Sequence, residues 1–176
     1  MPVRWNSTYL MLKAVIRDRV SFNGFINANY EVEPLITNET WHVITTLTAF
    51  LELFYDATIT LSGLYYPTSP LMVHTILVIA SHLKSYEGDG LLLNVVADMK
   101  TKYLKYWEHI PLLYAFAFIL DPKAKLEGYR SALNVLSASL SLDYADDFNM
   151  APDKLYEVYA KYEQKYFGVR MQRPPP

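Results

Sequence analysis

Residues 37–61, TNETWHVITTLTAFLELFYDATITL, have the pattern of one long amphipathic helix. Thr37 or Asn38 can accept a hydrogen bond from a free backbone N–H of the first turn, which marks the start of the helix. The side chains that follow recur at the spacing of a single helical face, which Thr58 continues: Trp41, Ile44, Leu47, Leu51 and Phe54. Gly63 lies just after this pattern, so we expect the helix to end near Leu61.

The same periodicity recurs along the rest of the chain, and no stretch has the pattern of a good strand. It predicts helices over 7–20, 70–86, 91–108, 111–120 and 152–168, with a further helix that Asp121 caps at Pro122. Gly24 can adopt a left-handed turn, so we expect the first helix to stop near residues 22–24. The serine- and aspartate-rich stretch 137–151, SASLSLDYADDFNMA, is expected to be a loop.

These patterns predict an all-α fold, an irregular bundle of about six or seven helices. The length of 176 residues suits a single domain over 1–176. We expect its parts to be a first helix and connection (1–35), a central helical bundle (36–136), a loop (137–151), a C-terminal helix (152–168) and a tail (169–176). The tail is basic and ends in three prolines, which cannot continue a helix.

The composition of the chain excludes some kinds of fold stabilisation and of binding site. Apolar residues make up 52% of the chain and aromatic residues 15%, which is enough for a core and for an exposed apolar face. The chain has no cysteine, which excludes a disulfide framework and a thiolate zinc site. The formal net charge is only −2, but basic residues gather in 1–30 and 99–130 and acidic residues in 31–98. This separation favours a local anion site over general coating of a nucleic acid.

We expect an intracellular protein with no membrane segment. The longest apolar run, Leu71 to Ala80, is interrupted by His74 and Thr75 and is too short to span a bilayer. The first residues lack the charged, apolar and small-residue pattern of a secretory signal.

Three segments carry a resemblance to a known family. They are RWNSTYLML at Arg4–Leu12, LSGLYYPT at Leu61–Thr68 and ILDPKAKL at Ile119–Leu126. In this order they resemble the catalytic region of hAT-superfamily transposases and of the plant BED-zinc-finger proteins domesticated from them. The resemblance implies a nuclear protein and a helical region inserted into an RNase H-like core, so an RNase H label could apply with the sheet absent.

Catalysis in that family implies three carboxylates that hold two divalent metal ions. The resemblance places one acid upstream, one near the Arg-Trp block and one downstream of the insertion, and no carboxylate of this chain maps onto these positions. We therefore expect no enzyme activity and no cofactor. The histidines lack the i, i+4 spacing of a helical metal site. Asp143, Asp146 and Asp147 lack the glycine and bidentate glutamate of a calcium loop, so solvated loop acids are the simpler interpretation.

The predicted contacts with DNA come from the Arg-Trp block and from basic helices. The resemblance implies that Trp5 stacks on a displaced base while Arg4 holds a phosphate. The alternative is that Trp5 plugs the end of the bundle and Arg4 pairs with an acid. The DNA-binding candidates are Arg4, Trp5, Lys13, Arg17, Lys102, Lys105, Lys123 and Lys125. For Lys13 and Arg17 the alternative is a solvated face near a helix end.

Two functions follow from these expectations. The first is a non-catalytic, DNA-associated fragment of an hAT-like transposase, with DNA as its partner. The alternative is a module for protein interaction or dimerisation, which would use an apolar, tyrosine-rich helical surface. Tyr156, Tyr159, Tyr162 and Tyr166 lie at helical spacing on the last predicted helix, where they fit either the core or a groove for a partner helix.

Overall fold

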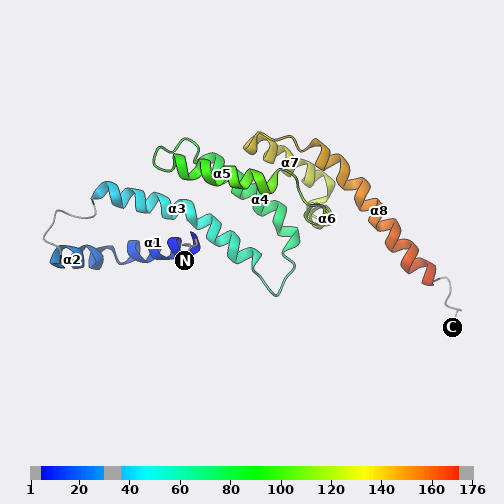
Figure 1. Ribbon diagram of the computed structural model, residues 1–176. Helices are drawn as coiled ribbons and strands as arrows, with labels where there is room; N and C mark the ends of the chain where they lie inside the picture. The colour runs from blue at the N-terminus through cyan, green and yellow to red at the C-terminus, as the bar shows by residue number, and fades with distance from the viewer. Residues whose placement is uncertain (1–4, 30–36, 171–176) are drawn as a thin grey trace. The chain divides into compact units, whose positions relative to one another are not determined.

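The computed structural model describes residues 5–29 and 37–170, and within them it contains eight helices and no strand (Figure 1). The all-α prediction is therefore confirmed, with one helix more than expected. The helices are α1 (Trp5–Arg17), α2 (Arg19–Asn29), α3 (Asn38–Leu61), α4 (Ser69–Ser85), α5 (Leu93–Trp107), α6 (Leu112–Ile119), α7 (Lys125–Leu140) and α8 (Ala145–Arg170).

The chain divides into two compact units. Unit 1 consists of residues 1–63 and 89–93, and unit 2 of residues 64–88 and 94–176. The expectation of a single domain over 1–176 stays a prediction. The boundary near Gly63 lies directly after α3, where the long apolar pattern of residues 37–61 ends.

In unit 1, α1 packs against α3 through the buried Tyr9. Its hydroxyl donates to Glu52 Oε1 at 3.0 Å, and its ring lies 4.8 Å from that of Tyr55. The predicted start of α3 is confirmed, because Thr37 Oγ1 accepts from the backbone N–H of Thr40 at 3.2 Å. A short local signal of this kind is readable from the sequence because every group that it needs lies within one turn.

The predicted end of the first helix at Gly24 is wrong. The backbone N–H of Asp18 donates to the Ala14 carbonyl at 3.0 Å, and Phe22 N–H donates to the Asp18 carbonyl at 2.9 Å, so the hydrogen bonds run on from α1 into α2. Gly24 lies inside α2, and no described glycine has a positive φ. Contacts with α3 support α2, because the Phe22 ring lies 6.3 Å from that of Trp41.

By length and composition alone, α3 could cross a membrane. Its residues Trp41, Phe50 and Leu51 are buried within the protein, and its carboxylate Glu52 bonds Tyr9 of α1. The expectation of no membrane segment considered only residues 71–80, and it stays a prediction.

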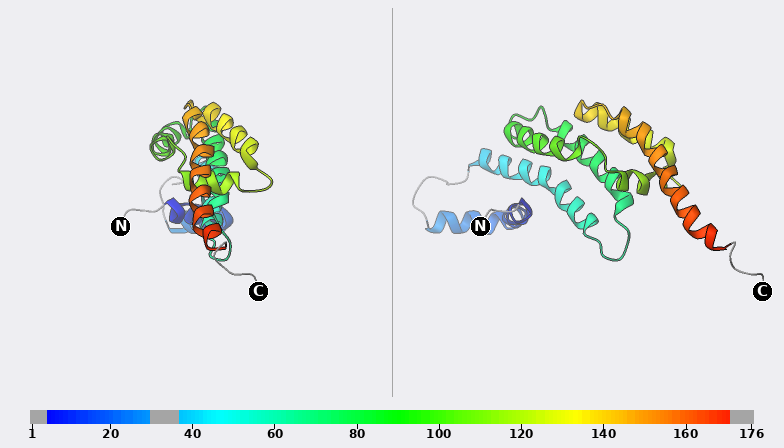
Figure 2. Two further views of the ribbon diagram at one scale, coloured as in Figure 1. Left: turned by 90° about the vertical axis from the view of Figure 1, so that its right-hand side faces the viewer. Right: turned by 45° about the vertical axis from the view of Figure 1, so that its right-hand side comes forward.

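The core of unit 2 is formed by α4, α6, α7 and the first turns of α8. Tyr129 of α7 is fully buried, and its ring lies 6.3 Å from the rings of Phe118 and Phe148. The other fully or nearly fully buried members include Val73, Ile76, Ala80, Ala115, Leu133, Leu136 and Ala151. Figure 2 shows the second half of α8, drawn in orange to red, extending beyond α4, α6 and α7.

The predicted loop over 137–151 is also wrong. Helix α7 continues to Leu140 and ends at Ser141, whose φ of 58° is left-handed, and α8 begins at Ala145. Leu136 and Leu140 are buried on one side of this connection and Ala151 on the other. Tertiary packing therefore overrides the weak helix preference of the serines and aspartates.

Pro152 was expected to open the last helix, but it lies inside α8. A proline there removes a backbone donor and crowds the carbonyl four residues earlier. The neighbouring Ala151 is fully buried and Phe148 belongs to the packed core, so packing holds the helix through this position.

Candidate nucleic-acid interface

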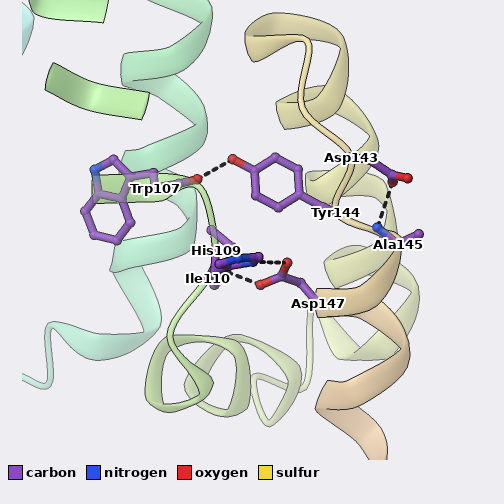
Figure 3. Close-up of polar contacts among 7 residues, drawn as sticks. All are labelled: Trp107, His109, Ile110, Asp143, Tyr144, Ala145 and Asp147. Carbon is purple, nitrogen blue, oxygen red and sulfur yellow. Dashed lines mark hydrogen bonds and ion pairs between the residues drawn. The ribbon is translucent and has the colours of Figure 1, made fainter. Parts of the chain in front are cut away.

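A buried carboxylate holds the start of α8 against the segment that joins α5 to α6. Asp147 is only 4% exposed. Its Oδ1 accepts the backbone N–H of Ile110 at 2.7 Å, and its Oδ2 lies 3.2 Å from His109 Nδ1 (Figure 3). We call these three residues the Asp147 clamp.

A second bond joins the same two segments. The hydroxyl of the buried Tyr144 donates to the Trp107 carbonyl at 2.5 Å (Figure 3). A local bond fixes the start of α8 itself, because Asp143 Oδ1 accepts the backbone N–H of Ala145 at 2.9 Å (Figure 3). Burial, with the charge of Asp147 beside it, raises the pKa of Tyr144 to about 12, which keeps this hydroxyl a donor. The end of α5 is thus fixed to the start of α8 through backbone atoms of Trp107 and Ile110.

His109 is the one clamp residue whose side chain faces solvent, with 78% of it exposed. The hydrogen bond to Asp147 raises the pKa of His109 above its usual value, and the negative charge of the same carboxylate acts in the same direction. Glu108 and Asp146 add smaller contributions. The clamp is therefore strengthened when His109 is protonated.

The sequence interpretation of Asp143, Asp146 and Asp147 as solvated loop acids is wrong for Asp147. Tyr144, Phe148 and Ala151 surround it at helical spacing, and this apolar face turns Asp147 inward. That spacing is the signal that could have shown that Asp147 is buried, although it does not identify His109 and Ile110 as its partners.

Beside the clamp lies an open hollow of about 510 Å³, and half of the residues that line it are acids. It is lined by His109, Asp146, Asp147, Asn149, Met150, Asp153, Lys154 and Glu157. The concentration of carboxylates opposes a phosphate at this position. The hollow is therefore a poor candidate for DNA contact.

Two predicted DNA-binding lysines, Lys102 and Lys105, are exposed on α5. They are three residues apart and so lie on one side of the helix. Between them Tyr103 points inward, where its hydroxyl donates to the Ile76 carbonyl of α4 at 2.6 Å. Burial raises the pKa of Tyr103 far above its usual range, so this anchor stays protonated. Within the described residues neither lysine has a hydrogen-bond or ion-pair partner.

Lys123 and Lys125 are exposed at the connection between α6 and α7. Asp121 Oδ1 accepts the backbone N–H of Lys123 at 2.9 Å, so Asp121 caps a turn here. The expected helix start at Pro122 is wrong, because α7 begins only at Lys125, which has a left-handed φ of 55°. The part of the chain that the structure describes offers neither lysine an acidic partner.

Lys13 and Arg17 of unit 1 are engaged with neighbouring side chains. Lys13 Nζ lies 2.8 Å from the Tyr9 hydroxyl and 3.3 Å from Glu52 Oε1. Arg17 forms two hydrogen bonds with Asp18, at 3.0 and 3.2 Å. Hydrogen bonds with Tyr9 and Glu52 raise the pKa of Lys13, and the same cluster lowers the pKa of Glu52. A phosphate would compete with these partners.

The Arg-Trp block gives no structural test of its two interpretations. Arg4 lies outside the described residues. Trp5 is the first residue of α1, but its side chain is not among those described. Base stacking by Trp5 and phosphate contact by Arg4 remain predictions.

No group of three or more histidine, aspartate or glutamate side chains in residues 5–29 and 37–170 is arranged to hold a metal ion. His42, His74 and His82 lie on α3 and α4, and His109 belongs to the clamp. The expectation of no enzyme activity stays a prediction.

The core interpretation of the α8 tyrosines is wrong. The exposed fractions of Tyr156, Tyr159, Tyr162 and Tyr166 are 73%, 59%, 60% and 55%. Helical spacing alone cannot separate a core face from an uncovered face, because both have the same period. The structure leaves these four rings as an aromatic surface.

Comparison with known proteins places the chain in a family. The family described as hAT-like transposase, RNase-H fold, matches residues 70–162, which is more than half of the chain. This region holds α4 to α7 and most of α8, and none of its residues is in a strand.

Proteins with similar sequences support the same family assignment. Zinc finger BED domain-containing protein RICESLEEPER 2 of Oryza sativa subsp. japonica is 24% identical over 161 residues, which cover 90% of this chain and 22% of the relative. DAYSLEEPER of Arabidopsis thaliana is 24% identical over 161 residues, covering 90% and 23%. A Zea mays protein named as an AC transposase is 30% identical over 169 residues, covering 89% and 20%.

The chain therefore spans about a fifth of the length of these relatives. No solved structure has significant similarity to it. The match over residues 70–162 and the relatives along most of the chain show that this protein belongs to the hAT-like transposase family with the RNase-H fold.

Proposed function

We propose that the chain is a non-catalytic, DNA-contacting helical region of an hAT-like transposase or of a protein domesticated from one. One observation carries the proposal: the exposed lysines of α5 and of the α6–α7 connection have no acidic partner among the described residues. They are Lys102, Lys105, Lys123 and Lys125.

Lysines of this kind bind DNA through its phosphates. Each neutralised phosphate releases condensed counterions, so the affinity falls as salt is added, with a slope set by the number of phosphates neutralised. Lys13 and Arg17 contribute less in this proposal, because their charges are already opposed by Glu52 and Asp18. Binding of this kind carries no base sequence preference of its own.

The relatives support DNA as the partner. One is named as a transposase, a class of enzyme that moves DNA segments, and others are named as BED zinc finger proteins. A nuclear location belongs to the same proposal, and a fluorescent fusion that stays outside the nucleus would count against it.

Fluorescence anisotropy with a labelled duplex tests the proposed DNA binding at low ionic strength. We expect salt-sensitive binding, and we expect Lys102→Ala with Lys105→Ala to reduce the salt slope by about 1 for each phosphate that is no longer neutralised. Lys154→Ala is the matched control, because Lys154 pairs with Glu157 on α8 and should leave the slope unchanged. Salt-independent binding, or no binding, overturns the proposal.

The non-catalytic part has a separate test. The purified chain is incubated with a DNA hairpin and magnesium or manganese ions, which supply the two-metal chemistry of the family when carboxylates hold them. We expect no cleaved product at any metal concentration. Metal-dependent cleavage by this chain would show that an active site exists and would refute the assignment.

A further inference from the structure

The second half of α8 is exposed although it carries four tyrosines. Every residue from Tyr156 to Phe167 is exposed. Figure 2 shows this part of the helix beyond α4, α6 and α7, with which it belongs to unit 2. Residues 153–165 carry six charged side chains: Asp153, Lys154, Glu157, Lys161, Glu163 and Lys165.

Three of the tyrosines share a face with the partly buried Leu155. The steps from Leu155 to Tyr159, Tyr162 and Tyr166 are four, three and four residues, which is the spacing of a helix that pairs with another helix. The rings of Tyr162 and Tyr166 stack, with centroids 5.8 Å apart and planes at 18°. We call these four residues the α8 strip.

Charge is distributed unevenly along this half of the helix. Residues 153–157 hold two acids and one base, and residues 161–165 hold two bases and one acid. Lys154 Nζ lies 2.9 Å from Glu157 Oε1, which leaves Asp153 as the uncompensated acid of the first segment. An antiparallel copy would set each acidic segment opposite a basic one, whereas a parallel copy would set like charges together.

We propose that the α8 strip pairs with the α8 strip of a second copy, antiparallel, about a two-fold axis near residues 160 and 161. Tyr159 of one copy then lies beside Tyr162 of the other, and Leu155 beside Tyr166. Such an interface is self-complementary, because the same surface serves on both sides.

The available area sets the strength of this pairing. The α8 tyrosines are each more than half exposed. Since a buried aromatic side chain removes about 150 to 250 Å² from water, pairing buries on the order of 1,000 Å² over both copies. This is at the low end for a specific interface, so the dimer dissociates on dilution.

DNA is a poorer occupant of the same surface. Acids and bases are equal in number over residues 153–165, so a polyanion gains no net attraction there. The lysines proposed to contact DNA lie on α5 and at the α6–α7 connection. Pairing through α8 is therefore independent of the proposed DNA binding.

Sedimentation velocity of the full chain over a concentration series tests the pairing. We expect a monomer–dimer equilibrium, and we expect Tyr159→Glu with Tyr162→Glu to raise the dimer dissociation constant by about tenfold or more. Gln164→Glu is the matched control on the opposite face of the same helix, and it should change the constant less than about twofold. Circular dichroism checks that both variants keep their helices.

The orientation has its own measurement. The chain has no cysteine, so Asp153→Cys or Ala160→Cys provides the only position for a spin label. In an antiparallel pair the labels at Ala160 lie close together, whereas those at Asp153 are offset by roughly 20 Å along the axis, because 15 residues separate them at 1.5 Å each. A parallel pair gives the same distance at both sites and overturns the proposed orientation.

A chain that stays monomeric throughout the series overturns the proposal. So does a dimer that Tyr159→Glu with Tyr162→Glu leaves intact, because the interface then lies elsewhere. Both results leave the salt-dependent DNA test unaffected, since that test rests on Lys102 and Lys105.

Discussion

Asp147 Oδ1 lies 2.7 Å from the backbone nitrogen of Ile110, so a side chain of α8 supplies the acceptor for a main-chain donor 37 residues earlier. The hydrogen bond is buried, and the same carboxylate also bonds His109. It therefore couples the α5–α6 connection to the first turns of α8, and its removal should be felt in the stability of unit 2.

Asp147→Ala should lower the free energy of unfolding by about 1.5 to 3 kcal/mol, because it removes a charged acceptor and leaves a buried N–H without a partner. Urea denaturation followed by circular dichroism measures the change. The control is Asp146→Ala, an exposed neighbour, which should stay within about 0.5 kcal/mol. Equal effects of the two substitutions would contradict the clamp.

Stability should depend on pH through His109. Its pKa is raised in the folded protein, so the ion pair with Asp147 contributes fully below the unfolded value of about 6.5 and is lost as pH rises through the folded value. The difference in unfolding midpoint between the parent chain and His109→Gln should therefore shrink as the pH rises above about 6.5 and through the raised pKa of His109. A histidine titration by NMR gives the pKa directly, and Asp147→Asn should return it toward about 6.5. A pKa at or below that value would show that the two side chains do not form an ion pair.

Tyr129 and Tyr144 offer a matched pair of buried hydroxyls. The Tyr129 hydroxyl has no hydrogen-bond partner among the described residues, whereas that of Tyr144 donates to Trp107. Tyr129→Phe should be neutral or slightly stabilising, and Tyr144→Phe should cost about 1 kcal/mol. Thermal unfolding of the two variants decides between this ordering and its reverse.

Pro152 and Pro70 should respond in opposite directions to alanine. Pro152 lies in the interior of α8, so Pro152→Ala should stabilise the chain by about 1 to 3 kcal/mol by restoring a donor to the helix. Pro70 lies in the first turn of α4, where Pro70→Ala should destabilise by about 0.4 to 1 kcal/mol through the freer unfolded chain. Chemical denaturation of both variants checks the signs, and a destabilised Pro152→Ala would mean that the ring itself packs in the core.

Local signals in the sequence were sufficient for much of the fold. The cap at Thr37 and the length of α3 follow from groups within a few residues of one another, and both were predicted correctly. The all-α class followed from periodicity, which depends only on spacing.

Tertiary contacts explain what the sequence missed. Ser139 and Asp147 disfavour a helix locally, yet both are buried in helices because α7 and the first turns of α8 share a core with α4 and α6. The tyrosines of α8 are exposed, so the core interpretation is wrong for them. The spacing of residues reveals an apolar face, but it does not reveal whether another helix packs against that face. The Asp147 clamp joins residues 37 positions apart, and no local pattern contains that distance.

The exposed half of α8 has a consequence for hydrogen exchange. Residues 156–167 make up about three turns that no buried side chain holds, and isolated helices of this length are marginal in water. Their amide protons should therefore exchange far faster than those of Leu133 or Leu136 in the buried face of α7. A partner that binds to this part of α8 would slow the exchange of these amide protons. The exchange rate of residues 156–167 therefore reports such binding without a label or a substitution.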